Sequence, residues 1–200
     1  MAITRQPTEV RRAQIKEAVQ QIIFEKGFKG LSIHNLSKEL NLSEGAIYRH
    51  FESKEQIILD IVKDVRDHMI YRLEEIANSS LPAGKRLEDF MCYHLQYLIK
   101  NKGITILLFT EATYQQNSKL KNKLREIFQA IKDAFKKIIK DGVDNGEWSS
   151  SIAVESMAIL YMSIPLTLNI EINLGLDHNI QDNFCDQMYQ LIVNTIKNSE

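Results

Sequence analysis

The sequence predicts an all-α fold with about nine helices. Three observations support this prediction: the 200 residues include only three prolines and eight glycines, apolar residues recur over long stretches with a period near 3.6, and strict apolar–polar alternation is almost absent. Hydrophobic residues make up 44% of the chain and charged residues 26%, which is ordinary for a folded chain with a substantial core. An intrinsically disordered chain is therefore excluded.

The first helix is expected to start at Pro7 and Thr8 and to stop at Gly27, because proline suits the first helical turn and glycine commonly ends a helix. Its apolar positions share one inward face: Ile15, Ala18, Val19, Ile22 and Ile23. We expect this helix to support the segment that follows it.

Residues 31–57 predict a helix-turn-helix that runs into a third helix. Ser32 can accept from the free backbone N–H groups at the start of the first helix of this segment. Asn41 follows the last apolar position of that helix, and asparagine is one of the few residues besides glycine that tolerate the left-handed conformation. A tight turn is therefore expected at Asn41.

A second, short helix is expected over residues 44–50, with Ser43 as its cap. Ser53 and Gln56 have the spacing of a capping box, so a third helix begins there and the second ends near Phe51. Three apolar residues of this region turn inward: Ala46, Ile47 and Phe51. The residues that stay outside, free to touch a ligand, are Glu44, Gly45, Tyr48, Arg49 and His50.

The rest of the chain predicts a helical body. A helix of about 24 residues from Lys54 to Asn78 would be about 36 Å long and can link two domains, and residues 79–84 interrupt the helical pattern. We place a DNA-binding domain over residues 1–53 and a ligand-binding and dimerisation domain over residues 54–200. Further helices of the body are expected over residues 87–98, 104–115, 120–142, 151–174 and 180–197.

Residues 151–174 carry apolar side chains on nearly every side of the expected helix, which must therefore be covered all round. The fifteen uncharged residues between Glu155 and Glu171 are fewer than the ~20 that a membrane span needs, so no membrane partner is expected. Pro165 should kink this helix. We expect a homodimer formed by the last two helices, through Met157, Tyr161, Ile164, Leu168, Phe184, Met188, Leu191 and Ile192.

Residues 48–51 and 53–55, Tyr-Arg-His-Phe and Ser-Lys-Glu, resemble the Y-x-H-F-x-x-K-E motif of the tetracycline-repressor (TetR) family. The resemblance extends back through residues 25–28 and covers roughly 50 residues with the family's spacing. Two positions depart from the family pattern, since Ser37 stands where most relatives have alanine and Asn41 where most have glycine. The resemblance implies a helix-turn-helix that binds duplex DNA and a divergent effector domain.

A recognition helix in the major groove presents its N-terminal side chains to base edges. Reach and chemistry therefore give four candidates for base contacts: Glu44, Gly45, Ala46 and Arg49. The resemblance implies phosphate contacts from Tyr48, His50 and Lys54, and Ser32 and Ser43 stand near helix starts whose N–H groups also favour anions. The alternative for Tyr48 is packing on the first helix, and for His50 closure of the motif.

The charge distribution gives modest support. The chain has a net charge of −1, but residues 1–54 hold nine Lys and Arg against six Asp and Glu, whereas the remainder holds sixteen against twenty. The basic part is therefore the part that contains the motif.

The C-terminal part has more aromatic and methionine residues than a minimal dimer needs, so its helices could enclose a pocket. The candidate lining residues are Met91, His94, Leu95, Leu98, Phe109, Tyr114, Phe128, Tyr161 and Met162. For each of them, ordinary core packing is the alternative. The resemblance implies an effector cavity whose occupancy shifts the long helix and the spacing of two DNA-binding heads, and the apolar lining suits a hydrophobic or amphipathic small molecule.

No catalytic motif or metal site with zinc-like spacing is present, so we expect no enzyme, no metal and no cofactor. Cys92 and Cys185 are expected to be buried reduced thiols, and the N-terminus lacks an export signal, so the expected location is the cytoplasm. The predicted function is a ligand-responsive, sequence-specific regulator of transcription, a repressor released from its operator by the effector. The alternatives are a protein-interaction module whose helix-turn-helix no longer reads DNA and, with least support, a small-molecule-processing enzyme.

Overall fold

The computed structural model describes residues 7–102, 104–114, 118–176, 180 and 182–197, without the side chains of residues 113 and 114. Its helices, in chain order, are α1 (Thr8–Gly30), α2 (Ile33–Glu39), α3 (Glu44–Tyr48), α4 (Lys54–Asp64), the π-helix η1 (Val65–Ile70), α5 (Tyr71–Asn78), α6 (Ala83–Lys100), α7 (Ile104–Tyr114), α8 (Ser118–Asp144), α9 (Val154–Asn173) and α10 (Phe184–Lys197). Since α4, η1 and α5 follow one another without a break, the described residues form nine continuous helices and no strand. The predicted all-α fold is confirmed.

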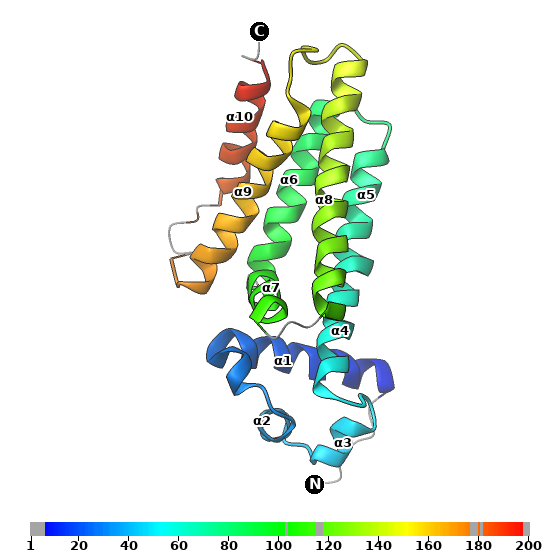
Figure 1. Cartoon of the computed structure of the whole chain (residues 1–200), viewed down its shortest axis with the longest axis vertical. Coiled ribbons are helices and arrows are strands. Elements are labelled where there is room, and N and C mark those ends of the chain that lie inside the picture. Colours follow the sequence, from blue (N-terminus) through cyan, green and yellow to red (C-terminus); the bar gives the residue numbers. More distant parts are fainter. Residues whose placement is uncertain (1–6, 103, 115–117, 177–179, 181, 198–200) are drawn as a thin grey trace.

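The molecule is elongated, with a small head at one end (Figure 1). Helices α1, α2 and α3 form this head, and α4 leaves it to continue as η1 and α5 along the body. Helices α6, α8, α9 and α10 run lengthwise in the body, whereas α7 lies between the body and α1. The head and the body therefore meet through α4 and through the contact of α7 with α1, and Lys102, just after α6, donates to Gln21 Oε1 of α1 at 2.6 Å.

Gly27 interrupts α1, as the sequence predicts. Its backbone is left-handed, with φ +65°, and the chain resumes a short helical course to Gly30. Glycine accepts this conformation without a steric penalty, so the residue ends the long part of the helix.

The long helix that follows the head is not uniform, which the sequence did not predict. Residues 65–70 form a π-helix in its middle, with Val65, Met69 and Ile70 buried. π-helical segments are rare in proteins, and those that occur are often found at functional sites. Here the π-helix lies where the helix passes from the head into the body.

A continuous buried core joins head and body, running from Ile15 of α1 through Phe90 and Phe135 to Ile196 of α10. A smaller cluster lies between α6 and α9, formed by Leu95, Leu98, Leu168 and Ile172. Among the described helices, none is long and apolar enough to cross a membrane.

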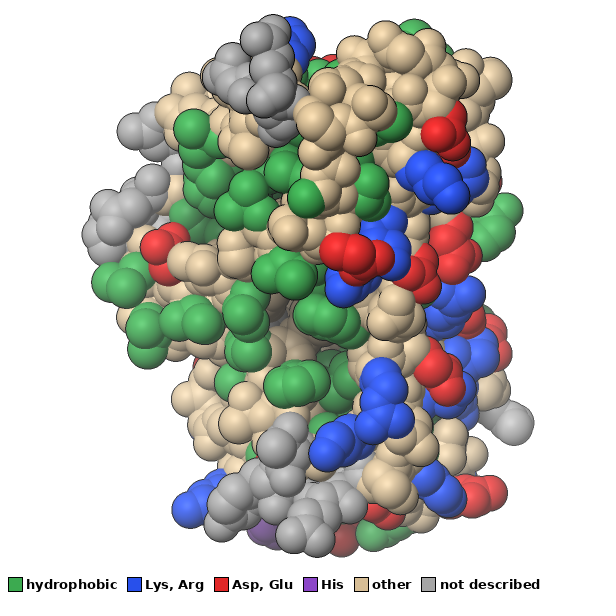
Figure 2. All heavy atoms as spheres, turned by 45° about the horizontal axis from the view of Figure 1, so that its top comes forward, with side chains coloured by type: hydrophobic (Ala, Val, Ile, Leu, Met, Phe, Trp, Pro, Cys, Tyr) green, Lys and Arg blue, Asp and Glu red, His purple; other side chains and the backbone are tan. Residues whose placement is uncertain are grey.

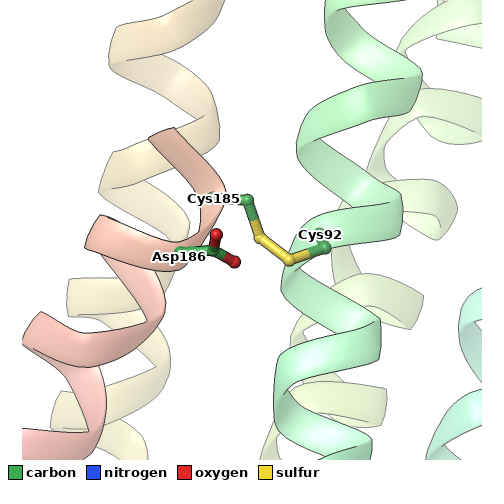
Figure 3. A group of neighbouring side chains, drawn as sticks. All are labelled: Cys92, Cys185 and Asp186. Atoms are coloured by element: carbon green, nitrogen blue, oxygen red, sulfur yellow. A yellow bond between two sulfur atoms is a disulfide. The ribbon is translucent and has the colours of Figure 1, made fainter. Parts of the chain in front are cut away.

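The expectation of two reduced thiols is wrong. Cys92 of α6 and Cys185 of α10 form a disulfide, with Cα atoms 5.2 Å apart (Figure 3). The two cysteines are 93 residues apart in the sequence, and only the packing of α10 against α6 brings them within the distance that a disulfide requires. The bond ties the last helix to the centre of the body.

Candidate nucleic-acid interface and ligand pocket

Serine caps set the start of each helix of the DNA-binding motif. The Oγ of Ser32 accepts from Asn35 N at 3.0 Å, and the Oγ of Ser43 accepts from Ala46 N at 3.1 Å. The Oγ of Ser53 likewise accepts from the backbone of the third residue after it, at 3.1 Å. Side chains that satisfy free N–H groups in this way hold a helix start in place. The predicted starts of all three helices are confirmed.

The turn between α2 and α3 has the predicted conformation. Asn41 has a left-handed backbone with φ +51°, and the N–H of Leu42 donates to Ser37 O at 2.8 Å. Ser37, where the family usually has alanine, is buried and donates its hydroxyl to His34 O at 2.8 Å. The serine therefore fits the helix crossing because its polar group has a partner.

The outward edge of α3 is open to solvent. Ile47 and Phe51 point into the core, at 0% and 2% exposure, which fixes the rotation of the short helix. Of residues 44–50, four are exposed: Glu44, Gly45, Tyr48 and Arg49. Ala46 is half-buried, so it is the least exposed of the four predicted base-contact residues.

The predicted phosphate-binding residues lie around this edge in different degrees of burial. Tyr48 is half exposed, at 51%. His50 is partly buried, and its Nδ1 is buried without a partner among the described residues, so a phosphate contact would use Nε2. Lys54 is the first residue of α4, and its Nζ lies 3.4 Å from Leu31 O. The hydroxyls of Ser32 and Ser43 accept as caps and keep their own protons for donation.

A side-chain contact between α2 and α3 was not predicted. The Nδ1 of His34, on α2, lies 3.0 Å from a carboxylate oxygen of Glu44, and both side chains are exposed. The two residues are ten positions apart, and only the crossing of the two helices brings them together. Any contact of Glu44 with a base would therefore compete with His34.

Arg12 of α1, which the sequence analysis missed, holds the end of the motif in place. Its guanidinium donates to His50 O, pairs with Asp60 at 3.0 Å and lies over the ring of Phe51, 4.1 Å from its centroid. Lys16, one turn further along α1, pairs with Asp60 as well, at 3.3 Å. These contacts attach α3 and α4 to α1, so the outward edge of α3 is held in place against α1.

A mainly apolar pocket of about 230 Å³ lies in the body. Its lining comes from η1, α6, α7, α8 and α9: Met69, His94, Leu98, Thr105, Ile106, Phe109, Leu124, Ile127, Phe128, Ile131, Met162, Pro165, Leu166 and Asn169. Five predicted lining residues are among them: His94, Leu98, Phe109, Phe128 and Met162. Phe109 and Phe128 are about half exposed, at 53% and 51%, so the pocket has aromatic side chains at the surface.

Three other lining predictions are wrong, because Met91, Leu95 and Tyr161 are buried in the core and do not line the pocket. Their positions on α6 and α9 face neighbouring helices, and only the rotation of each helix decides this. The side chain of Tyr114 lies outside the described residues. The sequence analysis also missed Asn169 and Thr105, since polar residues in an apolar helix gave no sign of facing a cavity.

His94 gives the wall of the pocket a polar side chain, and this side chain is uncharged at neutral pH. The Nδ1 of His94 lies 2.7 Å from the hydroxyl of Tyr161, and both residues are buried. Burial lowers the pKa of His94 to about 4 and raises the pKa of Tyr161 well above its ordinary value. At neutral pH both groups therefore stay neutral.

Four of the eight predicted dimer-interface residues do not lie on the surface of the chain. Met157, Tyr161, Leu168 and Ile192 are buried within the same chain, at 6% exposure or less. The other four predicted residues are Ile164, Phe184 and Met188, which are half-buried, and Leu191, which is 60% exposed. The inward side of α9 was mistaken for its outward side, because both sides are apolar.

The face of α9 that is exposed is apolar as well. Its large side chains are Ile159, Leu160, Leu166, Ile170 and Leu174, each at least 44% exposed. Figure 2 shows hydrophobic side chains gathered on the side of the molecule where α9 and α10 lie, next to a region of mixed charges. Contiguous apolar surface of this kind marks an interaction site.

Cys92, Cys185 and Asp186 form the cluster most like a metal site in the described part of the chain, with ligand atoms within 4.8 Å of one another (Figure 3). Metal binding by cysteine needs a thiolate. Both sulfur atoms are engaged in the disulfide, so this arrangement does not offer a metal site.

An exposed helix-turn-helix carried on a larger helical body is the architecture of a regulator of transcription. Residues 15–61 match the model of the family "Bacterial regulatory proteins, tetR family". The match shows that residues 15–61 form a DNA-binding domain of the TetR family, as the resemblance in the sequence predicts.

Known relatives within this family have diverse roles. The chain is 27% identical over 142 residues to the nucleoid occlusion factor SlmA of Aliivibrio fischeri, covering 70% of this chain and 71% of that protein. It is 26% identical over 141 residues to the fatty acid metabolism regulator protein of Bacillus subtilis, covering 70% and 72%. The crystal structure of the regulator FadR from Bacillus subtilis in complex with stearoyl-CoA has the same fold, with a TM-score of 0.69 and 20% identity over 94% of this chain and 98% of that one. The relative from Bacillus subtilis and the FadR structure are both named as regulators.

Proposed function

We propose that this TetR-family regulator is a sequence-specific repressor that binds its operator as a homodimer and is released by a small hydrophobic or amphipathic effector. Residues 1–53 would read DNA, and residues 54–200 would bind the effector and dimerise. The observation that supports DNA reading best is the open edge of α3, from Glu44 to Arg49, on a firmly held support. A protein that reads chromosomal DNA would act in the cytoplasm, the compartment that the sequence predicts.

In this proposal the residues that contact DNA divide into two groups. Arg49 donates to guanine O6 and N7 and Glu44 accepts from cytosine N4, while Gly45 and Ala46 allow close approach to the groove. Tyr48, His50 and Lys54, with the two cap serines, contact phosphates and set the register. The first group would determine specificity and the second would determine affinity.

The effector site in this proposal is the pocket lined by His94, Phe109 and Phe128. Its lining is mostly apolar and carries no charged side chain, which suits an apolar ligand. The relatives support this class of ligand, because one is a fatty acid metabolism regulator and the similar FadR structure contains stearoyl-CoA.

Two elements can transmit occupancy of the pocket to the head. Helix α7 supplies Thr105, Ile106 and Phe109 to the pocket and packs against α1. The π-helix η1 supplies Met69 to the pocket and follows α4 without a break. A ligand that binds one arrangement of these helices more tightly would shift the position of the head, and a change in the spacing of two heads would spoil their match to successive major grooves.

The homodimer in this proposal uses the exposed apolar face of α9 together with Leu191 of α10. A second copy of the chain would cover side chains that are now half or more in solvent, such as Ile159 and Leu174. Two-fold pairing also suits DNA reading, because each copy then meets one half of a palindromic site.

A mobility shift with the DNA upstream of the protein's own gene tests the proposal. We expect a sequence-dependent shift that weakens steeply with salt, because phosphate contacts release counterions, and that is reversed by a small hydrophobic or amphipathic effector. Unrelated duplex DNA of the same length is the control. Absence of any shift, even at low salt, would contradict the proposal and favour a helical protein-interaction module.

A further inference from the structure

One residue that lines the pocket has a buried hydrogen-bond acceptor without a partner among the described residues. Asn169 of α9 is only 6% exposed and lines the pocket. Its Nδ2 donates to Pro165 O at 2.7 Å, whereas its Oδ1 has no partner among the described residues. The donation fixes which end of the amide is which, because exchanging the two atoms would set oxygen against oxygen.

An unpaired acceptor in an apolar wall is unfavourable, and nearly all buried polar atoms in proteins have a partner. Eleven of the fourteen lining residues are apolar, so the wall offers little to satisfy the amide oxygen. A ligand that donates a hydrogen bond to Oδ1 would remove this penalty. The amide oxygen of Asn169 would therefore favour ligands that can donate a hydrogen bond to it.

The other polar groups of the wall do not suit an anion. The hydroxyl of Tyr161 and the Nδ1 of His94 are partners at 2.7 Å whichever of the two donates, and neither group carries a charge at neutral pH. The third polar residue, Thr105, is neutral. A carboxylate here would be desolvated without a counter-charge and would face the amide oxygen of Asn169, which repels it.

We propose that this pocket selects an uncharged apolar molecule that bears a hydrogen-bond donor, an alcohol in its simplest form, whose hydroxyl donates to Asn169 Oδ1. The inference rests on the proposed effector site and adds to it the chemistry of the ligand's polar group. Asn169 is then the residue that determines specificity, while the apolar wall determines affinity.

The test measures binding of three probes to the full-length protein by titration calorimetry: 1-octanol, its isomer heptyl methyl ether, and octanoate at pH 8. The ether accepts hydrogen bonds but cannot donate one. We expect 1-octanol to bind about tenfold more tightly than the ether, which corresponds to one recovered buried hydrogen bond, and octanoate to bind more weakly than either. Since this comparison uses the unaltered chain, it does not depend on the folding of a variant.

The variant Asn169→Leu should lose the preference and bind 1-octanol and the ether within about twofold of each other. Asn101→Leu is the matched control, because Asn101 makes the same contact to the residue four before it, Tyr97 O at 2.8 Å, but does not line the pocket. This control should keep the preference.

Equal binding of the alcohol and the ether to the unaltered chain would overturn the inference, as would a preference that persists in Asn169→Leu or the absence of binding by all three probes. Release of operator DNA by 1-octanol is measured separately. A preserved alcohol preference without any release would contradict the proposed function and leave the inference standing.

Discussion

The two sites of this protein present their polar groups in opposite ways. In the head, charged and polar side chains stand in solvent on the edge of α3, and the buried residues beneath them only hold that edge in place. In the body, neutral polar atoms of His94 and Asn169 stand inside an apolar wall. If both sites act as proposed, charge and salt would govern DNA binding by the head, whereas desolvation and unpaired polar atoms would govern ligand binding in the pocket.

The largest effect is expected at the surface that would bring two heads together. Ile159→Glu places a charge on the most exposed isoleucine of α9 (65%), so the dimer should dissociate and operator affinity should fall about 100-fold or more, since each head then binds alone. Analytical ultracentrifugation and a mobility shift measure the two effects. Ile99→Glu, at an isoleucine of α6 that is 44% exposed, is the control and should leave both unchanged; an intact dimer in Ile159→Glu would contradict the proposed interface.

The disulfide should stabilise the body strongly. Replacing Cys92 and Cys185 by serine should lower the free energy of unfolding by about 2–4 kcal/mol, because the bond closes a long loop in the unfolded chain. Denaturant titration with and without a reducing agent measures this. Reduction should lower the stability of the unaltered protein by the same amount and leave the double variant unaffected. If reduction has no effect on the unaltered protein, the disulfide contributes nothing.

The pocket should make stability depend on pH through His94. Its pKa of about 4 in the folded protein lies below the ordinary 6.5, so between these values the unfolded chain takes up a proton that the folded chain does not. Stability should therefore fall as the pH drops from about 6.5 to about 4, by roughly 3 kcal/mol from this residue.

Denaturant titrations from pH 7 to pH 4.5 measure this contribution. His94→Gln should lose part of the pH dependence, whereas His68→Gln, at an exposed histidine of η1, should keep it. Parallel curves for the unaltered protein and His94→Gln would show that His94 is not kept neutral by the fold.

The same difference between head and body explains what could be predicted from sequence. Ser32, Asn41, Ser43 and Ser53 act on residues within a few positions of themselves, so capping and turn chemistry located the helices of the head before any tertiary contact was known. The helices of the body were also predicted, by apolar periodicity.

What could not be predicted depends on how whole helices pack. α9 is apolar all round, so its sequence does not say which side is inward, and Tyr161 and Leu168 were placed in the wrong surroundings. Arg12 meets His50 and Asp60, and Cys92 meets Cys185, across separations that no local pattern spans. Asn169 was missed because an asparagine in an apolar helix is identified as a pocket residue only by what surrounds it.

The most direct test of the account compares Arg49→Ala with Lys54→Ala in operator binding over a range of salt concentrations and single base changes. We expect Lys54→Ala to weaken binding to every sequence and to lower the salt slope by about 1, and Arg49→Ala to relax the preference at particular bases at a cost of about 1–3 kcal/mol. Arg125→Ala, at an exposed arginine of α8, should change neither. Unchanged binding in both head variants would contradict the claim that the open edge of α3 reads DNA.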